Sequence, residues 1–462
     1  MNYLQSVAYI ESLSPTLEKP GLSRIAKFMA GHGDCQNQYK VFHVGGTNGK
    51  GSTVAVLDSI IQQTGKRVGR FTGPHLLRWN ERFHIDGKPI EDMVFAQLAT
   101  KVREQSEFFG RSDELGPLTW FEFLTALAFQ WFAISKVDVA VMEVGLGGRF
   151  DATNIVENVA ATIITNVDLD HTHILGDTVE QIAFEKAGIV KAKVPVVTGA
   201  QGGAWPVIRQ KCASLAAPLY TCTLDGEHQF NATVDGGADK QVCAFARQLF
   251  NRHKGELALP GGYQLGNAFA ATVALIASGV NFGLSADELD RAVGAGFAKV
   301  YWPGRSQYLP RRNLILDGAH NPAGARALRN CLDEMFPDQP TAFVVSCFEN
   351  KNAPKIVDEL LHKGDRLFLS EAAGRRATYN KQELADYCRQ AGYDVTVSAT
   401  IAAAYEAARL NRQPNETIVC TGSFATVREL MQHLQWHLVE DGRPECAKII
   451  GSARVETSVE SM

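Results

Sequence analysis

The 462-residue sequence lacks several features that would assign it to a special class. Its nine cysteines are scattered and contain no C-x-x-C pair, which argues against a disulfide framework and a zinc site. Basic and acidic residues nearly balance, 46 against 50, so charge gives no reason to expect binding to nucleic acid or an anionic membrane. No apolar run approaches the roughly 20 residues of a membrane span, and no signal peptide opens the chain. We therefore expect a cytoplasmic protein with reduced cysteines.

Apolar, strand-like runs alternate with amphipathic helical patterns along most of the chain. A chain of this length predicts two or three domains. In the N-terminal part, we expect strands over 40–44, 137–145 and 159–167, and helices over 50–65 and 119–136. From residue 313 a regular alternation predicts a second α/β domain of about five parallel strands, over 313–318, 341–348, 365–372, 394–399 and 416–422, with a last helix over 425–438.

The stretch KVFHVGGTNGKGS departs from the usual phosphate-loop pattern. The pattern G-x-x-x-x-G-K-[ST], aligned on Lys50, expects glycine and a hydroxyl residue where this sequence has Val44 and Gly51. The hydroxyl comes one place later, at Ser52. Because the loop joins a strand to a helix, its backbone N–H groups and the positive helix end still converge on one spot that Lys50 can reach. We interpret the loop as a phosphate site rather than only a glycine-rich turn.

Two further strand ends carry groups suited to a ligand site. A strand ends on Glu143, and the carboxyl ends of parallel strands are where α/β proteins bind ligands. Polar residues cluster after these strands: Arg149 and Asp151 in one turn; Asp168, Asp170, His171 and His173 in another; and Glu185 and Lys186 in the helix that follows. Glutamate, histidine and a loop serine form a Mg²⁺ shell that nucleotide phosphates would complete. A third cluster, Asp317, His320 and Asn321, opens the second domain.

Four motifs in chain order resemble the folylpolyglutamate synthase/dihydrofolate synthase family, a branch of the Mur-ligase superfamily: GTNGKGS, EVGLGGRFDATN, DHTHILGDTVEQIAFEKAGIVK and LDGAHNP. TGPHLLRWNERF, WPGR and TGSFATV also fit, so the resemblance covers residues 1–435. It implies an α/β fold with an N-terminal P-loop NTPase-like Mur-ligase central domain and a C-terminal Rossmann-like domain. We expect the ATP- and folate-binding domain over 1–298, a linker over 299–310, the glutamate ligase domain over 311–440 and a disordered tail over 441–462.

The resemblance also implies a reaction. The carboxylate of dihydropteroate or of a folate attacks ATP to give an acyl phosphate, and the amine of L-glutamate then displaces phosphate. Implied cofactors are ATP and Mg²⁺ at two sites, with K⁺ as a candidate further cation. The implied partners are small-molecule substrates only, and the implied quaternary state is a monomer.

Site residues follow from the matching motifs. For ATP phosphates the resemblance names Gly46, Thr47, Asn48, Gly49, Lys50, Gly51 and Ser52, and for the metals Ser52, Glu143 and His171. Lys186 resembles the family's carbamylated lysine. The implied catalytic residues are Lys186, Arg305 at the γ-phosphate, and Asp317 and His320 across the domain cleft. Arg305, Asp317 and Asn267 would also contact the nucleotide. The implied substrate-binding residues are Thr119, Phe121, Asp151 and Ala152 for the pterin, Pro74 and His75 in a mobile loop, and Ser423 for the glutamate carboxylate.

Two positions depart from the family's pattern. Tyr263 stands where the family often has histidine, and Asn350-Lys351-Asn352 replaces an Asp-Lys-Asp sequence. We therefore assign no role to the second segment, whose change can bear on glutamate handling or chain extension.

Three alternatives compete with this interpretation. A peptidoglycan Mur ligase would need a further domain before the loop, and only 45 residues precede Gly46. A P-loop switch protein that only hydrolyses ATP would not need the second domain's Asp317, His320 and Ser423. A catalytically dead homologue would not retain Lys50 and Lys186. Within the family, we expect both ligase activities and keep either activity alone as the alternative.

Overall fold

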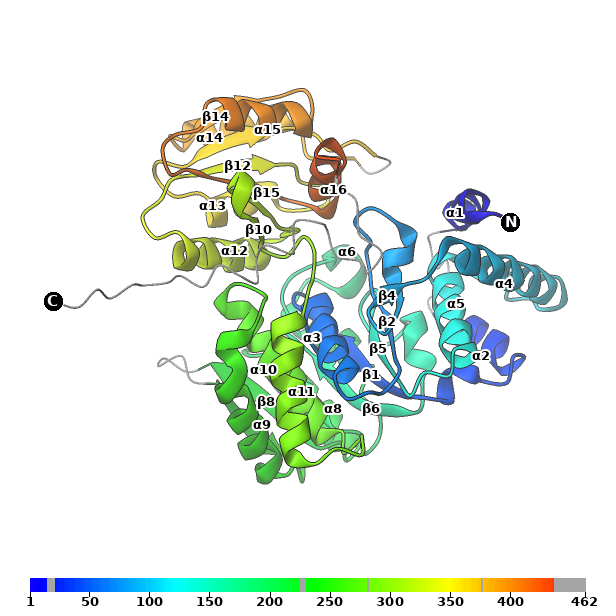
Figure 1. Cartoon of the computed structure of the whole chain (residues 1–462). Helices are drawn as coiled ribbons and strands as arrows, with labels where there is room; N and C mark the ends of the chain where they lie inside the picture. Colours follow the sequence, from blue (N-terminus) through cyan, green and yellow to red (C-terminus); the bar gives the residue numbers. More distant parts are fainter. Residues whose placement is uncertain (15–20, 225–229, 281, 375–376, 436–462) are drawn as a thin grey trace.

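The computed structural model describes residues 1–14, 21–224, 230–280, 282–374 and 377–435. Two α/β units are stacked on one another, each built on its own sheet (Figure 1). The predicted tail over 441–462, and the end of the helix predicted over 425–438, lie outside the described residues.

The first sheet has nine strands in the order β4-β3-β2-β5-β1-β6-β7-β8-β9. Strands β2, β5, β1, β6, β7 and β8 are parallel, while β3, β4 and β9 extend the two edges antiparallel. The largely parallel sheet predicted from the alternating pattern is confirmed. The strands are β1 (Lys40–Gly45), β2 (Val68–Phe71), β3 (Phe83–Ile85), β4 (Lys88–Pro89), β5 (Val139–Glu143), β6 (Val159–Ile164), β7 (Val196–Thr198), β8 (Leu219–Leu224) and β9 (Phe230–Asp235).

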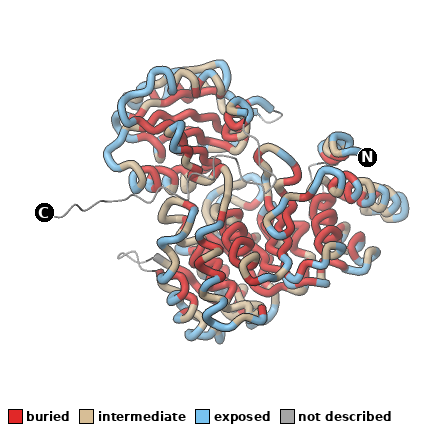
Figure 2. Tube along the Cα trace, in the orientation of Figure 1, coloured by how far each residue is buried: buried red, intermediate tan, exposed pale blue. Residues whose placement is uncertain are grey.

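Helices cover both faces of this sheet, and Figure 2 shows that the residues between these layers are buried. Two clusters of buried hydrophobic side chains fill this space. Helix α3 is buried over its whole length from Gly51 to Ile61, because the sheet lies on one side of it and helices α10 and α11 on the other. The helices of this unit are α1 (Tyr3–Ser12), α2 (Ser23–Ala30), α3 (Lys50–Gln62), α4 (Asp92–Ser112), α5 (Trp120–Ile134), α6 (Thr172–Leu175), α7 (Val179–Ala187), α8 (Ala204–Ser214), α9 (Lys240–His253), α10 (Gly262–Ala277) and α11 (Ala286–Lys299).

The second sheet has the order β10-β11-β15-β12-β13-β14. Its last five strands are parallel, as predicted, and β10 pairs antiparallel with β11. Strand β10 lies inside the segment predicted as a linker, 299–310, so this sheet begins before the predicted boundary: Gln307 and Leu309 are buried against the edge of β11. The elements are β10 (Gln307–Leu309), β11 (Leu314–Leu316), α12 (Pro322–Met335), β12 (Thr341–Val345), α13 (Ala353–Leu360), β13 (Arg366–Leu369), α14 (Lys381–Gln390), β14 (Asp394–Val397), α15 (Ile401–Leu410), β15 (Thr417–Thr421) and α16 (Phe424–His433).

The carboxyl ends of the central strands set the place of the site. Val44 of β1 pairs with Glu143 of β5, so the loop after β1 and the carboxylate that ends β5 leave the sheet at the same edge. In the second unit, the turn after β11 and the turn after β15 leave their sheet together, because Leu316 pairs with Cys420. These are the edges at which open parallel sheets bind ligands.

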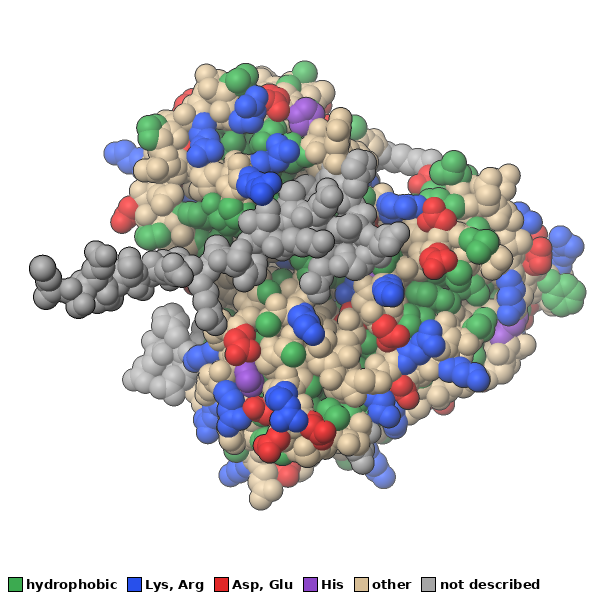
Figure 3. Space-filling view, in the orientation of Figure 1, with side chains coloured by type: hydrophobic (Ala, Val, Ile, Leu, Met, Phe, Trp, Pro, Cys, Tyr) green, Lys and Arg blue, Asp and Glu red, His purple; other side chains and the backbone are tan. Residues whose placement is uncertain are grey.

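Basic and acidic side chains are interspersed on the face of the first unit that Figure 3 shows, in keeping with their near balance in the sequence. Within the described ranges, no helix combines the length and the apolar character that crossing a membrane requires.

Candidate active site

A cavity of about 270 Å³ lies between the two units and draws its walls from both. From the first unit it takes the whole loop after β1, the end of β5 and parts of α7 and α10; from the second it takes the turn after β11 and the start of α12. The predicted residues that line it are Gly46, Thr47, Asn48, Gly49, Lys50, Gly51, Ser52, Pro74, Glu143, His171, Lys186, Asn267, Arg305, Asp317 and His320. The structure thus brings together every residue predicted for ATP, metal and catalysis.

The path of the loop explains its glycines. Gly46 has φ 137°, and a Cβ there would lie 1.9 Å from Thr165 Oγ1. Gly49 has φ 85°, and its Cβ would lie 2.3 Å from Asn267 Oδ1. A side chain at either position would clash and would adopt a left-handed backbone that L-residues rarely accept. These two glycines let the backbone N–H groups approach a bound phosphate closely.

The displaced hydroxyl of the loop has a packing cause. A Cβ on Gly51 would lie 2.7 Å from the Trp302 indole, which rests against the start of α3. The Arg70 guanidinium covers the same indole at 5.4 Å from the ring centroid, so the ring has little room to move. The Trp302 ring therefore occupies the space that a side chain at position 51, the usual serine or threonine, would need. The buried Ser52 is the next hydroxyl on the helix.

We expect Gly51→Ala to destabilise the protein and weaken nucleotide binding. Overpacking a filled site costs about 1–3 kcal/mol, which exceeds the roughly 1 kcal/mol that alanine adds to a helix over glycine. Displacing Trp302 would also move the nearby Arg305. Urea unfolding with and without ATP measures both effects, and Gly51→Ala combined with Trp302→Leu should recover part of the loss. A Gly51→Ala protein as stable as the wild type would contradict the packing argument.

Lys50, the first residue of α3, and Glu143, the last residue of β5, line the same cavity. The Lys50 ammonium donates to the carbonyl oxygens of Gly46 and Thr47, both at 3.1 Å, so its charge is held beside the loop. Glu143 is 6% exposed and accepts a hydrogen bond of 3.1 Å from the Gly73 amide. Burial raises the pKa of Glu143 in spite of the positive charge of Lys50. Because burial disfavours the charged form of this carboxylate, a cation bound beside it would stabilise that form. The position of Glu143 therefore favours a bound cation.

The donor groups fit Mg²⁺ only when the substrate completes the shell. Among the described residues, no three histidine, cysteine, aspartate or glutamate side chains are close enough to hold a metal alone. Mg²⁺ is usually bound by one or two carboxylates, with water and substrate phosphates filling the other positions. Ser52, Glu143 and His171 line the same cavity as the phosphate loop, which is the arrangement that this kind of site requires.

Lys186 is a buried amine without a carboxylate partner at ion-pair distance among the residues that the structure describes. It is 4% exposed, and its ammonium donates to the Gly46 carbonyl at 2.7 Å. Burial, with the positive charge of Lys50, lowers the pKa of Lys186 to about 7. A large fraction of this amine is therefore uncharged near neutral pH, and an uncharged amine is a nucleophile.

His171 and Asp170 lie just before the first turn of α6, with His171 at the N-cap position. Burial lowers the pKa of His171 to about 4, against the attraction of the Asp170 carboxylate, so the imidazole is neutral at pH 7 and keeps a lone pair for a metal. Burial alone would raise the pKa of Asp170, but the hydrogen bond and charge of His320 and the charge of Lys351 outweigh it and hold that pKa far below its usual value. Asp170 is thus a firmly ionised carboxylate in the cavity wall.

The second unit contributes a fixed acid and a histidine. Asp317 is 4% exposed and accepts hydrogen bonds from the Ser306 amide at 2.6 Å and the Ala319 amide at 2.7 Å. His320 Nδ1 lies 2.9 Å from the Gly318 carbonyl, which turns Nε2 toward the first unit. The departure at Tyr263 is accommodated here, because its hydroxyl lies 2.8 Å from Ser306 Oγ.

Six predicted residues lie outside the lining of this cavity: His75, Thr119, Phe121, Asp151, Ala152 and Ser423. Several have local structural roles. Thr119 and Ser423 are the N-caps of α5 and α16. Asp151 accepts hydrogen bonds from the Leu146 amide, at 2.9 Å, and from Thr153, so both of its oxygens already have partners. Their assignment to substrates stays a prediction.

The predicted mobile loop docks on the second unit. Leu76 is 5% exposed and packs in the apolar cluster that includes Leu309 and Val427. His75 accepts a hydrogen bond of 2.9 Å from Arg82 Nε, and burial lowers the pKa of His75 to about 2. The loop is therefore part of the domain interface in this structure.

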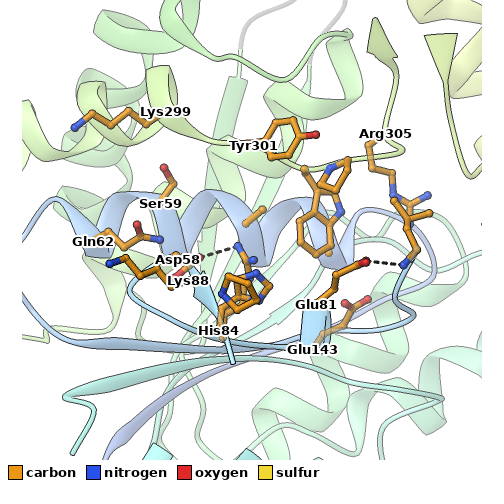
Figure 4. A pocket seen from close by; sticks show the side chains of 18 of the residues that line it. Asp58, Ser59, Gln62, Glu81, His84, Lys88, Glu143, Lys299, Tyr301 and Arg305 are labelled. Atoms are coloured by element: carbon orange, nitrogen blue, oxygen red, sulfur yellow. Dashed lines mark hydrogen bonds and ion pairs between the residues drawn. The ribbon is translucent and has the colours of Figure 1, made fainter. Parts of the chain in front are cut away.

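A second cavity, of about 230 Å³, adjoins the first beside α3. Figure 4 shows Glu143 and Arg305 near one end of it and Lys299 near the other. Arg70 and Asp58 form a buried ion pair of 2.8 Å in its wall. The two cavities share Gly51, Gly73, Pro74, Glu143, Arg305 and Phe424, so both lead to the same carboxylate.

Sequence reasoning missed contacts that cross between the units. Asn48 and Asn321 exchange amide hydrogen bonds of 3.2 and 3.0 Å, and Lys351 forms an ion pair with Asp170. Asp170 stands next to His171 in a predicted cluster, which is a usable signal. No local sequence pattern could predict the ion pair between Asp170 and Lys351, since 180 residues lie between them in the chain.

The geometry agrees with comparisons to known proteins. Residues 122–275 match the Mur ligase middle domain and residues 304–424 the Mur ligase glutamate ligase domain. A Bacillus subtilis (strain 168) protein named dihydrofolate synthase/folylpolyglutamate synthase is 37% identical over 349 residues, 74% of this chain and 79% of that protein. Folylpolyglutamate synthase of Lacticaseibacillus casei is 32% identical over 448 residues, 94% of this chain and 99% of that protein.

A solved structure of similar fold has been determined with ligands bound. The bifunctional folylpolyglutamate synthase/dihydrofolate synthase from Yersinia pestis, complexed with AMPPNP and a Mn ion, matches with a TM-score of 0.77 and 28% identity. The match covers 94% of this chain and 98% of that one. The two-unit fold, the shared cavity and the relatives agree, and the chain belongs to the folylpolyglutamate synthase/dihydrofolate synthase family of the Mur ligases.

Proposed function

We propose that this protein is an ATP-dependent ligase that joins L-glutamate to dihydropteroate and to folylpolyglutamates. The observation that carries the proposal is the shared cavity: phosphate loop, Glu143 and Lys186 come from one unit, and Asp317 and His320 from the other. A hydrolase needs only the first set. A ligase must also hold an amine acceptor against an activated carboxyl group, and a second wall provides that.

The substrate carboxylate attacks the γ-phosphorus of ATP, forming an acyl phosphate and releasing ADP. The glutamate amine then attacks the acyl carbon, loses a proton, and phosphate leaves. Negative charge builds up where the substrate carboxylate meets the phosphates of ATP. It would be stabilised by Lys50, Arg305 and the N–H groups at the start of α3. Ser52, Glu143 and His171 would hold Mg²⁺, which supplies further positive charge at the transferring phosphoryl group.

Lys186 is proposed to act as a carbamate. Its pKa of about 7 leaves an amine that can add to CO₂ and release a proton. The adduct replaces a buried cation with a carboxylate-like group beside the phosphate loop, where a positive charge would compete with the metals. A second Mg²⁺ site and a K⁺ ion belong to the same proposal.

The second unit is proposed to receive L-glutamate and to close on the nucleotide. Asp317 and His320 would contact ATP from the second unit, and Asn267 from the first. The N–H groups at the start of α16, after Ser423, would hold a glutamate carboxylate. By analogy with the family, we further propose that the enzyme works as a cytoplasmic monomer.

The proposal includes activity on two acceptors. The proposed pterin residues Asp151, Ala152, Thr119 and Phe121 lie outside the lining of both cavities, and the Phe121 ring abuts the Gly145 turn that follows β5. The second cavity, beside α3, is itself lined by Glu143. We propose that dihydropteroate binds at the pterin residues and folylpolyglutamates in the second cavity.

The test offers dihydropteroate and tetrahydrofolate separately, each with ATP, Mg²⁺ and L-glutamate, and measures phosphate release. We expect release with both acceptors, dependent on glutamate in each case. Release with dihydropteroate alone would make the protein a dedicated dihydrofolate synthase, and release with tetrahydrofolate alone would remove the pterin pocket. Glutamate-independent release in both would overturn the ligase proposal.

A further inference from the structure

Asp170 of the first unit is the centre of a cluster that joins the two units. Three side chains of the second unit reach it: Lys351 forms an ion pair with Oδ1, Asn321 Nδ2 lies 3.3 Å from Oδ2, and His320 Nε2 lies 3.5 Å from Oδ2. The side chains of Asp170 and Lys351 are each 9% exposed. The ion pair is therefore mostly removed from water, where it is screened less than a surface pair.

Among the described residues of its own unit, Lys351 has no carboxylate at ion-pair distance. It lies in the turn between β12 and α13, held by a hydrogen bond of 3.0 Å from its amide to the Phe348 carbonyl. Its neighbours Asn350 and Asn352 are exposed, uncharged amides, and Asn352 caps α13 by accepting from the Lys355 amide at 3.2 Å. Among the described residues, Asp170 is the only carboxylate within ion-pair distance of Lys351.

The cluster continues into the phosphate loop. Asn321, which contacts Asp170, also exchanges two amide hydrogen bonds with Asn48 of the loop. The backbone N–H of Asn48 in turn donates to Asn166 Oδ1 at 2.8 Å, which connects the loop to the segment just after β6. A displacement of the turn that carries Lys351 would therefore alter contacts that reach the nucleotide site.

We propose that Lys351 is a positioning residue: by pairing with Asp170 it holds the second unit closed against the phosphate loop, so that His320 and Asn321 stay at the cavity. The uncharged neighbours of Lys351 leave its ammonium to Asp170, which gives the Asn350-Lys351-Asn352 sequence a physical role. Losing the ammonium leaves the carboxylate of Asp170 without its lysine partner, with His320 and Asn321 of the second unit and the adjacent His171 as its remaining contacts. A mostly buried carboxylate that has lost its ion-pair partner favours an open cleft. The kinetic test of this inference rests on the proposed function. The test by molecular shape rests on the fold alone.

The test compares Lys351→Met with Lys355→Met. Both remove one positive charge, but Lys355 is exposed on α13, the helix that follows the turn of Lys351, and its variant serves as the matched control. Small-angle scattering with Mg²⁺ and a non-hydrolysable ATP analogue measures the radius of gyration of each full-length protein. We expect Lys351→Met to be expanded relative to the wild type and Lys355→Met to match it. Adding Asp170→Asn to Lys351→Met should expand it no further.

Kinetics provide the second measurement. We expect Lys351→Met to lower kcat roughly 100-fold, the size of effect that a misplaced group produces, while Lys351→Arg restores most of the rate. If Lys351→Met kept the wild-type radius of gyration and only raised the KM for glutamate, Lys351 would bind substrate and the positioning role would be overturned. Unchanged shape and unchanged kinetics would also overturn it. Failure of wild-type turnover would reject the proposed function and leave the scattering result to decide the inference by itself.

Discussion

Lys186→Ala is expected to nearly abolish ligation, lowering kcat by roughly 10³-fold, the upper range for removing one group that stabilises transition-state charge. Lys186 is 4% exposed and lines the shared cavity, so its substitution removes the proposed carbamate from that position. A short-chain carboxylic acid, or bicarbonate, added to the variant should restore part of the rate, because it can occupy the space that the side chain leaves. The rate of phosphate release measures both effects.

Lys191→Ala is the matched control for this experiment. Lys191 is half-buried, and its ammonium donates to the Asn154 carbonyl at 2.8 Å, but it does not line the cavity. We expect the Lys191 variant to ligate normally. A Lys186→Ala enzyme with full activity would remove Lys186 from the mechanism.

The same lysine predicts a dependence on pH. Since the pKa of Lys186 is lowered to about 7, its amine is mostly protonated at pH 6 and mostly neutral at pH 8. Only the neutral amine adds to CO₂. At a constant concentration of dissolved CO₂, the ¹³C NMR signal of a carbamate formed from labelled CO₂ should therefore rise between pH 6 and pH 8. It should be absent from Lys186→Ala, and a signal that is the same across this range would contradict the lowered pKa.

Glu143→Ala is the second substitution with a large expected effect. Glu143 is buried at the end of β5 and lines the cavity with Lys50, so its loss should raise the Mg²⁺ concentration for half-maximal activity by at least about tenfold. A Mg²⁺ titration of ligation measures the change. Glu185→Ala is the control, because Glu185 faces Arg149, at 3.7 Å, rather than the cavity. An unchanged titration for Glu143→Ala would refute its assignment to the metal.

Much of the site was predictable because it is local in sequence. The loop, its lysine and its hydroxyl follow one strand within a dozen residues, and Glu143 ends the next central strand, so alternation of strands and helices was enough to place them at one sheet edge. The same holds for Asp317 and His320 after β11. Fold and cavity agree with these predictions.

The rest depends on contacts between distant segments. Nothing near Gly51 in the chain indicates why the hydroxyl is displaced; the cause is Trp302, which folding brings onto α3. The sequence predicts a linker where β10 lies, because three residues carry too short a pattern to distinguish a strand, and only pairing with β11 defines it.

The sequence by itself determined the two α/β units, the phosphate loop and the residue types that surround the cavity, because hydrophobic period and glycine placement act over a few residues. Tertiary structure alone decided which partners those residues have. It buries Lys186 beside Lys50 and so lowers the pKa of its amine, and it brings Lys351 to Asp170 across the two units. Burial and pairing of charges depend on the whole fold, which no local pattern records.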